Sequence, residues 1–254
     1  MTDSPTRLRR EPPPLRSLIV VRTEARSPRM MRVVLGGPEL AGLEIPDPAS
    51  SVRLLVAWPG EPFELPNWNG NEFLLADGRR PALRTFTPVS LTDDELTLDV
   101  VRHPGGAISD WAETVTPGAP CAVSGPGRGE AIDPEAERYV LLGDETAIPA
   151  IEQLLRVIAD GTDVVVHIEI VADDARVDLP THPRAAVIWH VVRAGDPPGT
   201  TLRRAIEQTE IDDGTRVWAA GEAAAVQAIR KHLFDERGTP RSHTTIRGYW
   251  KVPR

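Results

Sequence analysis

The chain has 254 residues, of which 41% are hydrophobic and 26% charged, and its formal net charge is −8 at pH 7. This balance is typical of a soluble globular protein, and the negative charge argues against nucleic acid as a partner. No apolar run approaches the roughly 20 residues that cross a bilayer, and residues 1–14 lack the apolar stretch of a signal peptide. We therefore expect a cytoplasmic protein with no membrane span.

Cysteine and histidine usage limits the chemistry further. Cys121 is the single cysteine, which excludes an internal disulfide and a cysteine-ligated iron–sulfur cluster. The six histidines show no metal-ligand spacing such as His-x-x-x-His. Redox chemistry would therefore need a bound organic cofactor, and we predict no protein-bound metal. Nothing in the sequence demands an oligomer, so we expect a monomer.

The first half of the chain is rich in short strand-like segments. Residues 1–14 contain four prolines and little that could be buried, so we predict a disordered tail. Valine- and leucine-rich segments separated by Gly, Pro and Asp then predict a small antiparallel barrel or sandwich, with a helix over Ala107–Thr114. The candidate strands are Leu18–Thr23, Met30–Leu35, Val52–Trp58, Arg84–Thr87, Leu96–Arg102 and Pro120–Ser124.

The second half alternates strands with helices, which predicts parallel βα units. We expect an α/β protein of two domains, a β-barrel over 15–132 and an open parallel α/β domain over 133–254, divided within the Gly/Pro/Glu-rich stretch Gly125–Glu137. The predicted strands are Arg138–Leu142, Val164–Val171, Val187–Val192 and Arg216–Ala220, and the predicted helices are Ile148–Ala159, Leu202–Thr209 and Glu222–Arg237.

Arg84, Thr85, Phe86 and Thr87 form the first candidate site. In an extended strand, Arg84 and Phe86 point to one side and the two threonines to the other. A guanidinium can bind a phosphate, and a hydroxyl can hydrogen-bond the polar edge of a flavin ring. The alternative is an ordinary barrel strand with Phe86 in the core.

The second candidate site is the turn that follows the strand ending at Arg102. Glycines at Gly105 and Gly106 let the backbone approach a ligand closely. A helix start offers unpaired N–H groups to a pyrophosphate, and His103 and Ser109 could add side-chain hydrogen bonds. The alternative for His103 is a turn residue.

The third candidate site is Gly143-Asp-Glu-Thr-Ala-Ile-Pro149, between a strand and a helix. Ligands of open α/β sheets bind at the carboxyl ends of strands, where this turn lies. It is not the G-x-G-x-x-G fingerprint of dinucleotide sites. Asp144, Glu145 and Thr146 either contact a flavin or nicotinamide ring, or Asp144 and Thr146 merely cap the helix.

The carboxyl-terminal segment is basic. From Arg230 onward the sequence has seven Lys or Arg residues and two acidic residues, Asp235 and Glu236. Such a rim either attracts an anionic substrate or is a solvated helix face. We take Arg247 and Lys251 as candidate substrate contacts. Asp173 and Asp174 after the second α/β strand favour NADH over NADPH.

Together these segments resemble the siderophore-interacting protein family, a branch of the ferredoxin-reductase-like flavoproteins, over residues 16–254. The order and spacing of the motifs carry the resemblance, and Gly143–Ile151 matches the family pattern without a break. The chain departs from that pattern at Phe86 (family Tyr), Val89 (Arg), Ala107 (Pro) and Ile108 (Ala). The matching segments are Arg84–Val89, His103 with Gly106–Ala112, Gly125–Gly129, Gly143–Ile151, Ala220–Glu222 and Gly248–Trp250.

The resemblance implies FAD in the barrel domain and a second domain that receives NADH or NADPH. It implies that Arg84–Thr87 hold the flavin, that His103 and Gly106–Ser109 hold its pyrophosphate, and that Asp144–Thr146 lie near the ring or the nicotinamide. The implied activity is one-electron reduction of a ferric siderophore, with release of Fe(II); some relatives take electrons from ferredoxin. Two alternatives remain open: a general flavin reductase or diaphorase, and a non-enzymatic siderophore-binding protein whose FAD site Val89 has weakened.

Overall fold

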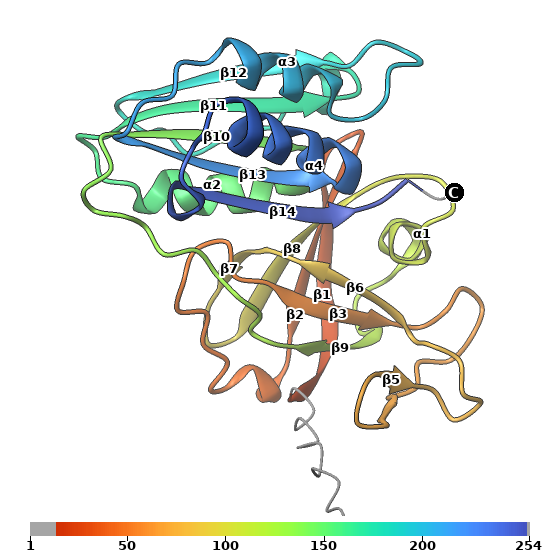
Figure 1. Cartoon of the computed structure of the whole chain (residues 1–254). Helices are drawn as coiled ribbons and strands as arrows, with labels where there is room; N and C mark the ends of the chain where they lie inside the picture. Colours follow the sequence, from red (N-terminus) through yellow and green to blue (C-terminus); the bar gives the residue numbers. More distant parts are fainter. Residues whose placement is uncertain (1–13, 253–254) are drawn as a thin grey trace, which may run out of the picture.

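The structure is a computed structural model, and it describes residues 14–252. The predicted tail over 1–14 lies outside the described residues except for Pro14. The chain builds a seven-stranded antiparallel sheet and a five-stranded parallel sheet, which occupy the lower and upper halves of Figure 1. A short hairpin, β4 (Asn67–Trp68) and β5 (Phe73–Leu74), extends from the lower half.

The antiparallel sheet is curled into a barrel by one continuous segment. Strands β6 (Ala82–Phe86) and β7 (Pro88–Leu91) lie at opposite edges of the sheet, although only Thr87 separates them in the chain. Because β6 pairs with β3 and β7 pairs with β8, this segment brings the two edges together. The order is β6-β3-β9-β1-β2-β8-β7, with β1 (Leu15–Ser27), β2 (Met30–Gly36), β3 (Val52–Val56), β8 (Glu95–Val101) and β9 (Pro120–Ser124).

Aliphatic side chains on alternate positions of these strands fill the barrel. Helix α1 (Ala107–Thr114) closes one end of this core, because Ile108, Trp111 and Ala112 pack into it. Each fully buried aliphatic side chain stabilises the fold by about 1.5–3 kcal/mol. The side chain of Ile108 is thereby committed to the core of the barrel.

All neighbouring strands of the second sheet are parallel, in the order β12-β11-β10-β13-β14. Helix α2 (Ile148–Val157) covers the face toward the barrel, and α3 (Thr200–Gln208) and α4 (Ala223–Lys231) cover the other face (Figure 1). Burial on both faces explains the near-continuous apolar runs of the central strands. The strands are β10 (Arg138–Asp144), β11 (Asp163–Ile170), β12 (Ala185–Val191), β13 (Thr215–Glu222) and β14 (Thr244–Trp250).

The chain order reverses between β10 and β13, because β11 follows β10 on one side and β13 returns to its other side. Open α/β sheets bind ligands at this switch point, beyond the carboxyl ends of the strands. The turns after Gly143 and Gly221 meet there, and β14 ends beside them at Trp250.

Buried polar contacts join the two halves. Arg26 of β1 binds Asp99 of β8 at 2.6 Å and Glu152 of α2 at 2.8 Å. Gln153 of α2 accepts a hydrogen bond from Ala49 N at 2.6 Å and donates one to the carbonyl of Pro88. Removing one partner of a buried ion pair is costly, so these contacts fix how the barrel sits against α2.

Several elements differ from the sequence prediction. Strand β14 was not predicted, because Thr244–Trp250 contains one aliphatic residue and lies at the edge of the sheet, where no apolar run is required. The helix predicted over Glu222–Arg237 is α-helical only to Lys231 and continues as a π-helical turn over His232–Glu236. Strand β7 was also missed, since Pro88 ends the pattern of the strand before it.

Candidate cofactor and substrate site

Strand β6 carries the first group of predicted site residues. Arg84 and Thr85 are exposed, and Phe86 is half-buried against the core of the barrel. Within the described residues, the guanidinium of Arg84 donates one hydrogen bond, from Nη1 to the carbonyl of Leu83 at 2.7 Å. A guanidinium has five N–H donors, so Arg84 keeps donors for an anionic ligand.

Thr87 differs from its neighbours because it is buried. Its side chain lies near that of Tyr249 on β14. Burial raises the pKa of Tyr249, and the neighbouring Thr87 offsets part of that rise. The side chain of Thr87 thus joins the barrel to the last strand of the parallel sheet.

The start of α1 has free backbone donors. Gly106 is the N-cap and supplies no side chain, and the first intrahelical bond runs from Asp110 N to Gly106 O at 2.8 Å. The N–H groups of Ala107, Ile108 and Ser109 therefore have no partner within the helix. They are the backbone donors that a pyrophosphate requires.

Two contacts shape this turn. The Ser109 hydroxyl is buried and accepts the backbone N–H of His103 at 2.9 Å. The exposed ring of His103 lies across Gly106, so closely that a Cβ at Gly106 would overlap it. His103 and Ser109 shape the turn, and α1 packs beside β6, the strand that carries Arg84. This set of donors fits a flavin dinucleotide.

At the switch point, the carboxylate of Asp144 accepts four hydrogen bonds. Thr146 donates through its N at 2.9 Å and its hydroxyl at 2.5 Å, Glu222 through its N at 3.0 Å, and Trp250 through Nε1 at 2.7 Å. Burial nevertheless raises the pKa of Asp144. Gly221 has φ 152°, and a Cβ there would lie 2.6 Å from Oδ2 of Asp144. Asp144 and Thr146 therefore organise the turn, with 38% of Trp250 exposed above it.

Glu145 is buried and lies between the two halves of the protein. It forms an ion pair with Arg29, which follows β1, at 3.0 Å, and accepts the N–H of Val171 at 3.2 Å. Its carboxylate is thus occupied by protein groups. Glu145 positions the switch-point turn against the barrel.

The two predicted substrate residues differ in availability. Lys251 is exposed. Arg247 donates to the carbonyls of Ala49, Arg128 and Gly129 and to Glu130, so both of its terminal nitrogens are already bonded. Arg247 fastens β14 to the segment that leaves the barrel.

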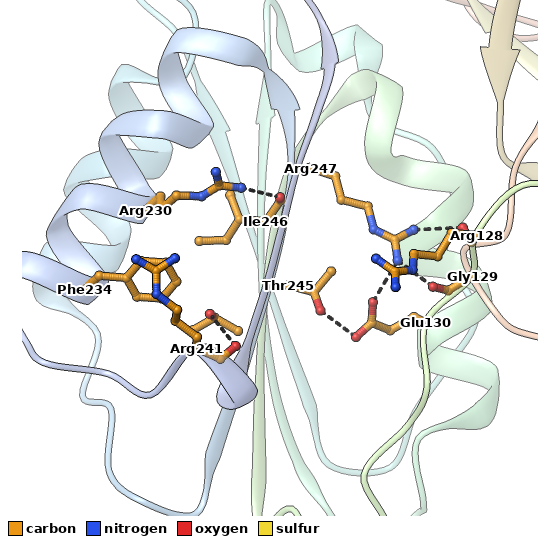
Figure 2. A pocket seen from close by; sticks show the side chains of 10 residues that line it. Arg128, Gly129, Glu130, Arg230, Phe234, Arg241, Thr245, Ile246 and Arg247 are labelled. Atoms are coloured by element: carbon orange, nitrogen blue, oxygen red, sulfur yellow. Dashed lines mark hydrogen bonds and ion pairs between the residues drawn. The ribbon is translucent and has the colours of Figure 1, made fainter. Parts of the chain in front are cut away.

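A groove of about 460 Å³ lies beside Arg247 and crosses β14 (Figure 2). The sequence analysis did not identify this site as a unit, because its residues come from α4, the turns between α4 and β14, β14 itself and the segment between the two sheets. The excess of basic residues after Arg230 was the signal that pointed toward it. The groove is lined by Arg128, Gly129, Glu130, Arg230, Phe234, Arg241, Thr244, Thr245, Ile246 and Arg247.

Comparison with known proteins identifies the family. Residues 19–130 match the model of the siderophore-interacting FAD-binding domain, and residues 136–252 match that of the siderophore-interacting protein. A crystal structure of a siderophore utilization protein from T. fusca superimposes with a TM-score of 0.83 at 36% identity, covering 96% of this chain and 95% of that one. The chain belongs to the siderophore-interacting protein family.

Within this family, the chain is 28% identical over 248 residues to the ferric vibriobactin reductase ViuB of Vibrio cholerae, covering 93% of this chain and 89% of ViuB. It is 31% identical over 240 residues to the mycobactin import ATP-binding/permease protein IrtA of Mycobacterium tuberculosis, covering 92% of this chain. It spans only 26% of the length of IrtA. The predicted ferredoxin-reductase-like fold class is confirmed by the arrangement of the two sheets and by solved reductases with this fold.

Residues 14–252 contain no helix that is long and apolar enough to cross a membrane. They also contain no group of three or more His, Cys, Asp or Glu side chains that could hold a metal ion. Cys121 is buried, and burial raises the pKa of its thiol to about 12, so it is a poor nucleophile.

Proposed function

We propose that this protein is a flavin-dependent oxidoreductase that uses FAD to reduce ferric siderophores and release Fe(II). The observation that carries the proposal is the uncapped start of α1, a helix that packs beside the strand of the exposed Arg84, inside a segment that matches a siderophore-interacting FAD-binding domain. The reductase name of ViuB supports the substrate class. We assign the flavin to a domain over 15–132 and the electron donor to a domain over 133–254.

The residues of the barrel bind and orient the cofactor. The N–H groups of Ala107, Ile108 and Ser109 hold the pyrophosphate, and the His103 ring and Gly106 shape the approach to it. Arg84 adds a charge-assisted hydrogen bond, which is stronger than one between neutral groups. Thr85 hydrogen-bonds the polar edge of the ring, and Phe86 supplies an apolar surface beside it.

The residues of the parallel sheet position the donor side. Asp144 and Thr146 keep the switch-point turn closed, and Glu145 fixes the distance of that turn from the barrel through Arg29. Trp250 limits access to the turn through its bond to Asp144. Thr87 and Tyr249 hold the end of β14 against β6, where the flavin and the donor would meet.

A bound FAD would supply the redox chemistry, because a flavin can take up a hydride and pass on single electrons. NADH or NADPH therefore supplies two electrons and one proton is released, while two ferric chelates each accept one electron and become ferrous. Reduced ferredoxin, as the other candidate donor, supplies one electron for each iron. Lys251 and the groove of Figure 2 lie on the substrate side. No iron ligand from the protein is required, because the chelator holds the metal.

The experiment begins with the flavin. The purified protein, or the protein incubated with FAD, should show bound-flavin absorbance; a protein that takes up no FAD would contradict the proposal. Anaerobic assays then supply NADH, NADPH or reduced ferredoxin with a ferric siderophore, and a ferrous-specific chromogenic chelator reports Fe(II). The matched assay replaces the chelate with free riboflavin. Faster reduction of riboflavin than of any ferric chelate would identify a general flavin reductase instead.

A further inference from the structure

The two edges of the parallel sheet differ in how they meet solvent. Strand β14, at one edge, carries threonines and Arg247, and its pairing with β13 shifts register between Gly221 and Glu222. Strand β12, at the other edge, pairs with β11 without a register shift and has no charged side chain. Charged residues and bulges are the features by which edge strands avoid pairing with other chains. Strand β12 has neither.

Apolar side chains gather along this edge. Four of the ten exposed large hydrophobic side chains of residues 14–252 lie on β12 or beside its end, and these are Val171, Val187, Ile188 and Val191. Adjacent residues of a strand point to opposite faces, so the exposure of both Val187 and Ile188 means that no helix fully covers either face of β12. In Figure 1, β12 is the strand of the parallel sheet that lies farthest from the barrel.

The backbone of β12 offers hydrogen-bonding groups to a further strand. Val192 N donates to Ile170 O at 2.9 Å, so the even-numbered residues of this segment face β11. Because strand residues alternate, the N–H and C=O groups of Val187, Trp189 and Val191 point away from the sheet. Within the described part of the chain, β12 has β11 as its only neighbouring strand. Such an edge is a template for strand addition.

The charge of this edge favours a second copy of the same chain as the added strand. The protein has a net charge of −8, so two copies repel each other over their acidic surfaces. Residues 185–192 carry no charged side chain, and the preceding Arg184 is paired with Asp163 at 2.6 Å. Two copies can therefore approach each other along β12 at the least electrostatic cost.

The strand is also complementary to itself. Antiparallel pairing about a two-fold axis through Ile188 aligns all seven residues of β12 with the seven of the second copy. Ile188 then lies opposite its own counterpart, and Val187 lies opposite Trp189, a combination of β-branched and aromatic residues that stabilises antiparallel strands. Arg184 lies opposite Val192, so it faces no like charge. The outward-facing backbone groups of the two strands would form about six hydrogen bonds.

We propose that the protein forms a symmetric homodimer in which two β12 strands pair in antiparallel fashion and join the parallel sheets of both copies into one continuous sheet. This dimer replaces the monomer expected from the sequence. Strand β11 separates β12 from β10 and the switch point, so the pairing leaves the proposed FAD and donor residues of both copies accessible. The inference does not depend on the proposed function.

Sedimentation velocity of the full chain at increasing protein concentration tests the dimer. The native protein should show a reversible monomer–dimer equilibrium. I188K places two lysines opposite each other across the two-fold axis and should weaken dimerisation at least about tenfold. I188E should do the same, and an equimolar mixture of I188K and I188E should dimerise again, because opposite charges then face each other.

The matched control is V157K, which adds the same charge at an exposed valine of α2. It should dimerise like the native protein. A native protein that stays monomeric at every concentration, or an equal effect of I188K and V157K, would overturn the proposal.

A disulfide cross-link tests the register without adding charge. Cys121 is the single cysteine of the chain and is buried, so a new intermolecular disulfide reports the introduced thiol. Residues opposite each other in a non-hydrogen-bonded antiparallel pair have Cα atoms about 4.5 Å apart, which a disulfide can span. Mild oxidation should convert I188C, but not V157C, to a covalent dimer. A dimeric protein in which I188C does not cross-link would contradict pairing through β12.

Discussion

The helix starts of the two halves of the molecule treat their backbone donors in opposite ways. Helix α1 has Gly106 as its N-cap residue, and no side chain among residues 14–252 caps it. In the parallel domain, Glu222 accepts the N–H groups of Ala224 and Ala225 at the start of α4, and Glu169 accepts those of Gly199 and Thr201 at the start of α3. A helix start closed by a buried carboxylate contributes to stability and repels a second anion. The start of α1 is left for a ligand.

The largest effect on FAD binding is expected from a substitution that blocks the uncapped start of α1. In G106V, a side chain would overlap the His103 ring and cover the free N–H groups of α1. We expect FAD affinity to fall at least about a hundredfold, because the charge-assisted hydrogen bonds from the N–H groups of α1 to the pyrophosphate would be lost. Fluorescence titration with FAD measures it. The control is G161V, at an exposed glycine with no atom within 4 Å of the added Cβ; an unchanged affinity in G106V would contradict the placement of the pyrophosphate.

Removal of the side chain that caps a helix start in the parallel domain should instead lower the stability of the protein. E222A removes the carboxylate that caps α4 and also accepts Val252 N. We expect the free energy of unfolding to fall by about 1–2 kcal/mol, the usual cost of losing an N-cap. Chemical denaturation of the apoprotein measures this loss. The FAD affinity of E222A should remain within about twofold of that of the native protein. A large loss of FAD affinity in E222A, with unchanged stability, would show that the two kinds of helix start do not differ in the way described.

Substitution of Arg84, the exposed arginine on β6, should weaken FAD binding and leave the stability of the protein unchanged. R84Q removes the charge of Arg84, whose one side-chain hydrogen bond within residues 14–252 is to the carbonyl of Leu83. We expect FAD to bind about tenfold more weakly, as for the loss of one charge-assisted hydrogen bond, with an unchanged free energy of unfolding. R156Q, on the surface of α2, is the control for charge alone. A drop in stability equal to that of E222A would show that Arg84 is structural.

The smallest effect concerns acid stability of the parallel domain. His167 on β11 bonds to His190 on β12 at 3.0 Å, and burial lowers the pKa of His167 to about 4, with a smaller contribution from His190. Thr209 faces the other ring nitrogen of His167, and Glu169 acts on His190. The unfolded chain then binds more protons than the folded protein between about pH 6.5 and 4. Stability is therefore retained above that window and lost as the pH falls through it.

H167Q should make this loss shallower, because one of the protons taken up on unfolding is removed. Urea denaturation of the apoprotein at several pH values between 6.5 and 4 provides the slope. H103Q is the matched control, since His103 is an exposed histidine in the barrel. Identical slopes for the native protein and H167Q would show that this histidine does not contribute to acid sensitivity.

Local patterns predicted most of the secondary structure but missed two edge strands, β7 and β14. Buried strands such as β10 and β11 show apolar runs that can be recognised in isolation. Strand β14 lies at an edge and has no such run, so its role as the carrier of Tyr249, Trp250 and Arg247 was not visible. Glu145 shows a related limit of local patterns. Its position after a strand predicted a ligand contact, but its ion-pair partner Arg29 is far away in the sequence and could not be recognised from a local pattern.

By itself, the sequence determined the family resemblance, the change from antiparallel to parallel architecture, and the uncapped glycine turn before α1. These features depend on short-range composition, periodicity and motif spacing. Only the tertiary structure decided which polar residues keep free donors. Arg84 remains available and Arg247 is occupied, although both are arginines in strands, because hydrogen-bond partners come from segments that meet only when the chain folds. The arginine groove across β14 arises for the same reason.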